Sequence, residues 1–193
     1  MKAVLARGRT VSASPPPAGQ RPGAIAARVL ADLRAVRDAD GAGARLPNGV
    51  RVSVAEQVDR QFLMHTVSVK LTTAAHGPAA AGHARVRQTG WLRRTGVQAV
   101  AAPGCDPAFE RTAATLLADA ALADALRPLH LADCAIDACD GRWTLAIVPF
   151  GGSEVVNRMP SFRRYVRLID EQADALAAAC LAFETALRRI LRG

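Results

Sequence analysis

The chain has 193 residues and half of them are apolar, which is enough to bury a core and excludes a wholly disordered protein. Charges, glycines or prolines break every apolar run before the roughly 20 residues that a membrane span needs, so we expect neither a spanning segment nor a membrane partner. The formal net charge is +8, and residues 45–103 contain eight basic residues but only two acidic ones. This basic segment predicts an anionic partner.

The first 22 residues contain three consecutive prolines and little apolar content, so we expect residues 1–22 to form a disordered tail and residues 23–193 to form a single α+β domain. The apolar run at residues 3–6 is far too short for a secretory signal. A chain that buries its own core needs no disulfide bonds, so the four cysteines are expected to be reduced thiols. Together these observations predict a cytoplasmic protein.

The N-terminal half of the domain is expected to contain one helix and four strands. Apolar residues at helical spacing predict a helix from about 23 to 39. Alternating residues at 50–55 and 66–71 predict two antiparallel strands, with residues 56–60 as their hairpin connection. Less regular alternation at 83–87 and 97–100 indicates two further strands.

The C-terminal half is expected to contain a helix, a hairpin and a second helix. Asp106 before Pro107 predicts a capped helix that continues to Pro128. Asp140 and Gly141 supply the residues that a tight hairpin turn requires. From residue 162 to residue 190, apolar positions alternate four and three residues apart, which predicts a long amphipathic helix over almost all of residues 161–192.

The apolar stripe of this last helix has two interpretations. A seam of this spacing suits a coiled coil, so a homodimer through residues 162–190 is one alternative. Many small alanines flank the stripe, so we favour packing across the chain's own sheet. The order of elements predicts an α+β fold, with an antiparallel sheet of about five to six strands packed by a long C-terminal helix and two shorter helices.

The segment after the last predicted strand is a candidate anion site. Paired glycines free the backbone there, and Ser153 is expected to cap a short helical turn, so backbone amides and nearby guanidinium groups suit a phosphate or carboxylate. An ordinary bend followed by a solvated arginine face is the competing interpretation. The candidate anion-binding residues are Arg93, Arg94, Gly151, Gly152, Ser153, Arg158, Arg163 and Arg164.

The same segment, GGSEVVNRMP followed by FRRYVRL, resembles the C-terminal signature of an uncharacterised bacterial family, known as a domain of unknown function. The resemblance implies a bacterial origin and a shared fold. It carries over no catalytic or binding residue, because no activity is attached to that family.

A second basic run mixes cations with one aromatic residue, as nucleic-acid surfaces do. No interleaved aromatic pattern or recognition helix accompanies it, so nucleic acid is less favoured than another anion. The residues of this run are His83, Arg85, Arg87, Trp91, Arg93 and Arg94.

An enzyme is the main alternative, with a pocket between the sheet and the C-terminal helix and with Ser153, Glu154 and Asn157 at its mouth. Ser153 lacks the G-x-S-x-G context of a hydrolase nucleophile, and the cysteines and histidines lack metal-ligand spacing. No phosphate-binding loop or dinucleotide motif is present, so no metal and no cofactor are expected. The first hypothesis is therefore a noncatalytic binding module for a small anion or polyanion, and a dimerising interaction protein is the further alternative.

Overall fold

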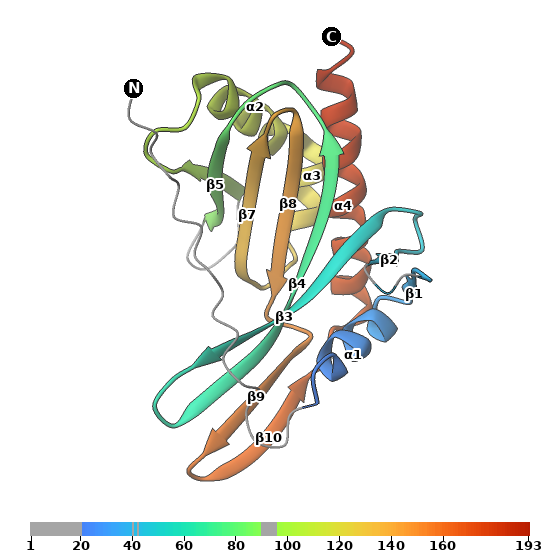
Figure 1. Ribbon diagram of the computed structural model, residues 1–193, viewed down its shortest axis with the longest axis vertical. Helices are drawn as coiled ribbons and strands as arrows, with labels where there is room; N and C mark the ends of the chain where they lie inside the picture. Colours follow the sequence, from blue (N-terminus) through green and yellow to red (C-terminus); the bar gives the residue numbers. More distant parts are fainter. Residues whose placement is uncertain (1–20, 40, 42, 90–95) are drawn as a thin grey trace.

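The protein has an α+β fold, and the computed structural model describes residues 21–39, 41, 43–89 and 96–193 (Figure 1). Four helices lie in this part of the chain: α1 (Ala24–Asp32), α2 (Pro107–Ala118), α3 (Ala120–Leu126) and α4 (Asp170–Ile190). The sheet is antiparallel and has ten strands: β1 (Val36–Arg37), β2 (Ala44–Arg45), β3 (Arg51–Arg60), β4 (Met64–His76), β5 (Gly82–Thr89), β6 (Gly96–Ala101), β7 (Leu131–Cys139), β8 (Arg142–Pro149), β9 (Ser153–Arg158) and β10 (Ser161–Val166). The predicted tail falls almost entirely outside the described residues.

The long strand β4 organises the sheet, whose order is β1-β2-β3-β4-β8-β7-β5-β6. One edge of β4 pairs with β3 along most of its length. The other edge is divided, because β8 pairs with residues 71–76 and β9 pairs with residues 64–67. We call β5 to β8 with residues 68–76 the body, and residues 56–67 with 153–166 the arm.

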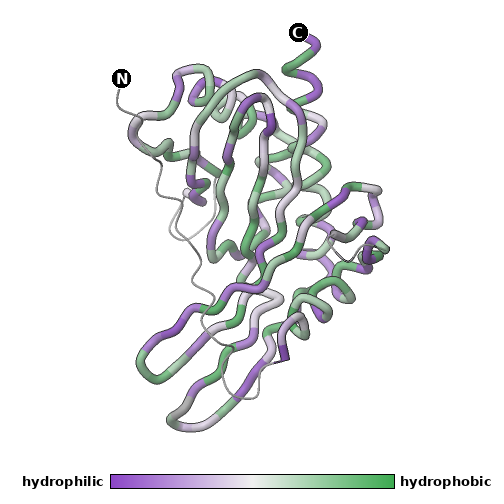
Figure 2. Tube along the Cα trace, in the orientation of Figure 1, coloured by the Kyte–Doolittle hydropathy of each residue, from purple (hydrophilic) through white to green (hydrophobic). Residues whose placement is uncertain are grey.

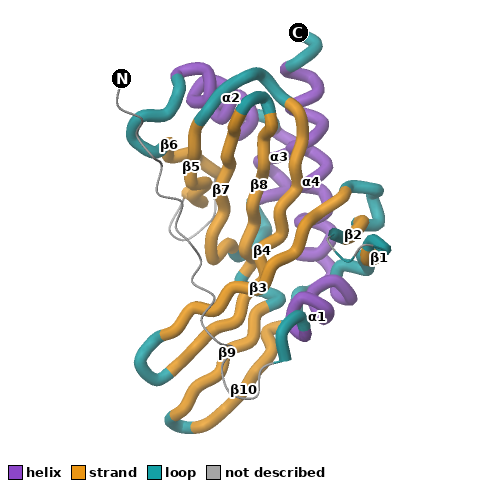
Figure 3. The backbone as a smooth tube through the Cα atoms, viewed as in Figure 1, coloured by secondary structure: helices purple, strands orange, loops and turns teal. Residues whose placement is uncertain are grey.

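The four helices of the described chain all lie on one face of the sheet (Figure 3). Behind the body, Phe109 of α2 stacks on Trp143 of β8 with ring centroids 5.2 Å apart. The indole of Trp143 donates a hydrogen bond to the carbonyl of Pro78 at 2.8 Å. These two aromatic side chains and Phe183 of α4 are among the largest fully buried groups, so the main core lies between the body and α2, α3 and α4.

Helix α4 packs its apolar stripe inside its own chain, against β4 and α3, as the sequence favoured. Its buried positions are Ala173, Ala175, Leu176, Ala179, Cys180, Phe183, Ala186 and Leu187. No helix of the described residues combines the length and the apolar composition that crossing a membrane requires.

The sequence prediction was wrong for the strand count and for the start of the last helix. The sheet has ten strands and not five to six, because β1 and β2 are short and residues 153–166 form a hairpin. Residues 161–166 are β10, and α4 begins only at Asp170. Phe162 and Val166 fit a helical spacing, but they also alternate with polar neighbours, and pairing with β9 decides between the two structures.

Three further boundaries differ from the prediction. Helix α1 ends at Asp32, so residues 33–39 are not helical. Residues 56–60 continue β3, and the turn to β4 lies at residues 61–63. The helix expected from Pro107 to Pro128 is broken at Asp119, whose extended backbone ends α2 and whose carboxylate accepts a hydrogen bond from the Leu122 amide of α3 at 3.2 Å.

Several local predictions are confirmed. The strands β3 and β4 pair antiparallel. Asp106 caps α2 by accepting a hydrogen bond from the Ala108 amide at 2.8 Å. Asp140 and Gly141 form the turn between β7 and β8 with φ values of 49° and 78°.

Helix α1 is attached to the sheet by one carboxylate at each end. At its N-terminus, Glu56 of β3 accepts hydrogen bonds from the amides of Gly23, Ile25 and Ala26 at 2.9–3.0 Å. At its C-terminus, Asp32 accepts a hydrogen bond from the Tyr165 hydroxyl of β10 at 2.8 Å. A carboxylate at a helix N-terminus satisfies unpaired amides and opposes the positive end of the helix dipole. Glu56 therefore holds α1 across the base of the arm.

We predict that Glu56→Ala lowers the free energy of unfolding by about 2 kcal/mol, because three amides of α1 lose a charged acceptor. Asp59→Ala is the matched control, since Asp59 lies on the same strand, is exposed and makes no ion pair or hydrogen bond with another described residue. Urea unfolding monitored by circular dichroism measures both variants. Equal stability of the two variants would contradict this role for Glu56.

Candidate functional site

The glycine bend at Gly151 and Gly152 lies between β8 and β9 and is buried. From Val67 to Leu71, β4 advances four residues, while the neighbouring chain advances seven, from Glu154 back to Ile147. The surplus residues form the bend, which lets both β8 and β9 pair with one edge of β4.

The polar groups of the bend are used within the chain. Gly152 has a φ of +84°, and its amide donates a hydrogen bond to the carbonyl of Val166 at 2.7 Å. Ser153 lies in β9 and does not cap a helical turn, because its hydroxyl donates to the carbonyl of Phe150 at 2.6 Å. Gly151, Gly152 and Ser153 thus brace the bend, and their role as anion ligands stays a prediction.

The remaining residues predicted for this segment point in different directions, because successive residues of a strand face opposite sides of the sheet. Glu154 is buried on the helix side, where its carboxylate lies 3.8 Å from the Arg163 guanidinium. Arg164 is exposed on the opposite side. The side-chain amide of Asn157 donates to the carbonyl of Met159 at 3.2 Å.

Three predicted anion ligands cannot be placed relative to the others. Arg93 and Arg94 lie outside the described residues, together with Trp91. Arg158 ends β9, but the structure does not describe its side chain. That Arg93 and Arg94 share one anion site with residues 151–164 therefore stays a prediction.

A different cluster of cations lies on the face of the sheet that the helices leave uncovered, which we call the open face. The register places Ser53 opposite Thr72, His83 opposite Asp137, and Arg85 opposite Ala135 on this face. The same alternation brings four cations to it: Lys70, Arg85, Arg87 and Arg142. In the described part of the chain, none of these four cations makes an ion pair or hydrogen bond with another side chain.

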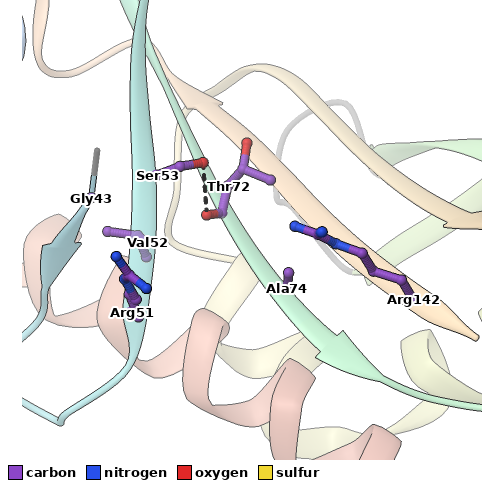
Figure 4. Close-up of a pocket in the computed structure, with 7 residues that line it drawn as sticks. All are labelled: Gly43, Arg51, Val52, Ser53, Thr72, Ala74 and Arg142. Atoms are coloured by element: carbon purple, nitrogen blue, oxygen red, sulfur yellow. Dashed lines mark hydrogen bonds between the residues drawn. The ribbon is translucent and has the colours of Figure 1, made fainter. Parts of the chain in front are cut away.

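A hollow of about 310 Å³ lies on the open face, where β3 and β8 flank β4. Figure 4 shows the residues that line it. Two guanidinium groups border it, but Arg51 is bound to Asp38 at 2.6 Å, whereas Arg142 extends across the sheet toward Thr72. Ser53 donates a hydrogen bond to the carbonyl of Thr72 at 3.4 Å, and the Thr72 side chain lies between Ser53 and Arg142. A guanidinium group with hydroxyl side chains on the same face suits an anionic oxygen.

A second hollow of about 390 Å³ opens where β5 and β7 separate, since their pairing ends at Arg85 and Ala135. Arg85 and Arg87 border it, and Asp133 supplies a carboxylate. Cys134 also lines this hollow, but burial and then the Asp133 carboxylate raise the pKa of its thiol well above the usual range. A thiol that stays protonated is a poor nucleophile, so the hollow has binding groups and not a reactive cysteine.

The two hollows contain no evident metal site. Among the described residues, no group of three or more His, Cys, Asp or Glu side chains is arranged to hold a metal ion. His83 is bound to Asp137 at 2.7 Å and both side chains are about half exposed. Sequence reasoning identified Arg85 and Arg87 as one face of a strand, but it missed Lys70 and Arg142, because only the strand order brings these distant residues together.

We predict that Gly152→Ala destabilises the protein by about 2 kcal/mol, because the positive φ of this position strains a residue with a side chain and the new methyl group would lie 2.7 Å from the Val29 side chain of α1. Gly151→Ala is the matched control, with an expected cost below about 1 kcal/mol, since its closest obstacle is the flexible end of Gln172. Thermal and urea unfolding compare the two variants. A larger loss for Gly151→Ala would contradict the role given to Gly152.

Comparisons with known proteins identify the family and no function. No curated protein and no solved structure matches the chain. A family model described as "Protein of unknown function (DUF3156)" matches residues 28–187, which is most of the chain. This agrees with the resemblance of the segment after β8 to a family without a known activity. The chain therefore belongs to the DUF3156 family of proteins of unknown function.

Proposed function

We propose that this protein is a noncatalytic binding module whose open face holds an extended anionic ligand. The observation that carries the proposal is the group of four cations on that face, Lys70, Arg85, Arg87 and Arg142, which make no ion pair with another described residue. Exposed arginines are commonly paired with carboxylates, as Arg34, Arg127 and Arg189 are elsewhere in the described chain. Cations left without such partners are available to a ligand.

The arrangement of the hollows favours a ligand with several negative charges. One hollow lies at β3, β4 and β8, and the other lies between β5 and β7. Strands β7 and β8 are paired neighbours, so a chain of phosphates or carboxylates lying across them reaches both hollows. Each hollow is open and has arginine side chains at its border, which suits a polymer lying along the sheet better than an enclosed small molecule.

The contacts of Ser153, Glu154 and Asn157 support a binding module over the enzyme alternative. Ser153 and Asn157 donate to carbonyls of adjacent turns, and Glu154 lies beside Arg163. Ser153 and Glu154 face opposite sides of β9, so they do not meet at the mouth of one pocket. None of the three is therefore positioned as a nucleophile with its base.

We predict that replacing three open-face arginines weakens polyanion binding at least about tenfold at low salt. The number of counterions released on binding, measured from the slope of the logarithm of the binding constant against the logarithm of the salt concentration, should fall by about two. Fluorescence anisotropy of a labelled short single-stranded oligonucleotide measures binding, and competition with polyphosphate and with inorganic phosphate separates a polymer site from a small-anion site. The variant is Arg85→Gln/Arg87→Gln/Arg142→Gln.

The matched control removes three exposed arginines away from the open face and so changes the net charge equally. Binding within about twofold of the wild type is expected for this control, because distant charges are screened. Equal weakening by both variants would indicate general charge attraction and would refute a defined site, as would the absence of binding at low salt. The control variant is Arg37→Gln/Arg111→Gln/Arg192→Gln.

A further inference from the structure

The turns of the two arm hairpins carry large apolar side chains that the protein does not bury. Phe62 is 93% exposed and Met159 is 73% exposed. Leu63 and Phe162 beside them are 44% and 45% exposed. We call these four residues the tip patch. Single exposed apolar residues are ordinary, but four at one end of a molecule are not.

The register places both turns at the same end of the sheet. Met64, at the start of β4, pairs with Asn157, near the end of β9. The β3–β4 turn immediately precedes Met64 and the β9–β10 turn closely follows Asn157, so the two turns lie next to each other. Figure 1 shows both hairpins extending away from α2, α3 and α4, and Figure 2 shows apolar colour at the β3–β4 turn.

The tip patch is held by regular structure. Strands β9 and β10 pair without a break from Ser161 opposite Arg158 to Val166 opposite Ser153. Strands β3 and β4 pair up to Arg60 opposite His65, directly below their turn. The apolar side chains lie at the ends of two hairpins with paired strands, so they form a projecting surface and not a groove.

Three arginines lie on the strands below the tip patch. Arg60, Arg163 and Arg164 are exposed there, and we call them the collar. Asp59 is the exposed carboxylate of this region, whereas Glu154 is buried beside Arg163. Positive charge therefore exceeds negative charge around the apolar tip, so the complementary surface is negatively charged outside and apolar beneath.

From this arrangement we propose that the tip patch docks the protein on an anionic phospholipid surface. Phe62 and Met159 insert among the upper acyl chains, and the collar binds lipid phosphates. A bilayer combines a negatively charged surface with an apolar layer a few ångströms below it, which matches an apolar projection with arginines on the strands behind it. Each arginine held near such a surface contributes about fivefold to partitioning.

The proposed docking departs from the expectation of no membrane partner, which rested only on the lack of an apolar run long enough to span a bilayer. The absence of a long apolar run excludes a spanning helix, whereas two hairpin turns reach only the interface. The proposed lipid contact also uses residues other than Lys70, Arg85, Arg87 and Arg142. The two proposals therefore succeed or fail separately.

We predict that the protein sediments with vesicles of phosphatidylcholine and phosphatidylglycerol and much less with phosphatidylcholine alone. Phe62→Ser/Met159→Ser is expected to lower vesicle binding at least about tenfold, because both inserted side chains are lost. Val36→Ser/Leu191→Ser is the matched control, since Val36 and Leu191 are 71% and 51% exposed elsewhere. It should bind like the wild type, as should Arg85→Gln/Arg87→Gln/Arg142→Gln.

Insertion itself is measured with the Phe62→Trp variant. This variant is made in a Trp91→Phe background, and its added fluorescence should shift to shorter wavelength and be quenched by lipids brominated on the acyl chain. Fluorescence of the Trp91→Phe protein alone should change little, because its remaining tryptophan, Trp143, is fully buried. Three results would overturn the proposal: no sedimentation with anionic vesicles, sedimentation that Arg163→Gln/Arg164→Gln abolishes while Phe62→Ser/Met159→Ser does not, or a dimer in solution that only the tip substitutions dissociate.

Discussion

The pairing of one long strand with two successive partners determines the shape of this protein. Strand β4 has 13 residues and passes from the body into the arm, and its second edge is shared by β8 and β9. The bend at Gly151 and Gly152 makes this sharing physically feasible, since an L-residue with a side chain at Gly152 would meet both backbone strain and Val29. Without this bend the neighbouring chain would continue along one straight strand, and no second hairpin would stand beside the β3–β4 turn.

The helices determine which parts of the sheet are buried and which are exposed. Helices α2, α3 and α4 cover one face of the body, while Glu56 and Asp32 attach α1 at the base of the arm. The opposite face and the hairpin ends stay exposed. The open face carries cations without carboxylate partners, and the hairpin ends carry apolar side chains. A module that binds a polyanion while it rests on an anionic membrane surface would use both regions.

The sequence predicts the parts of this structure that depend on neighbouring residues. Asp106 before Pro107 and the Asp140-Gly141 turn act within a few residues, so their patterns are sufficient. Strand β10 was interpreted as helix, because the spacing of Phe162 and Val166 fits both structures and only β9 decides between them. The hydrogen bonds from α1 to Glu56 join residues 30 to 33 positions apart, so no local sequence pattern predicts them. The exposure of Phe62 could not be predicted, because the identity of an apolar residue does not show whether the fold buries it.

Hydrogen–deuterium exchange of the wild-type protein tests most directly whether the arm ends and the open face are separate binding surfaces. Exchange is measured by mass spectrometry for the protein alone, with polyphosphate, and with phosphatidylglycerol-containing vesicles. We expect vesicles to slow exchange at residues 61–64 and 157–162, and polyphosphate to slow exchange in β5 and β8 without affecting those turns. Protection by vesicles that is confined to α4, or protection of the same peptides by both additives, would contradict this expectation.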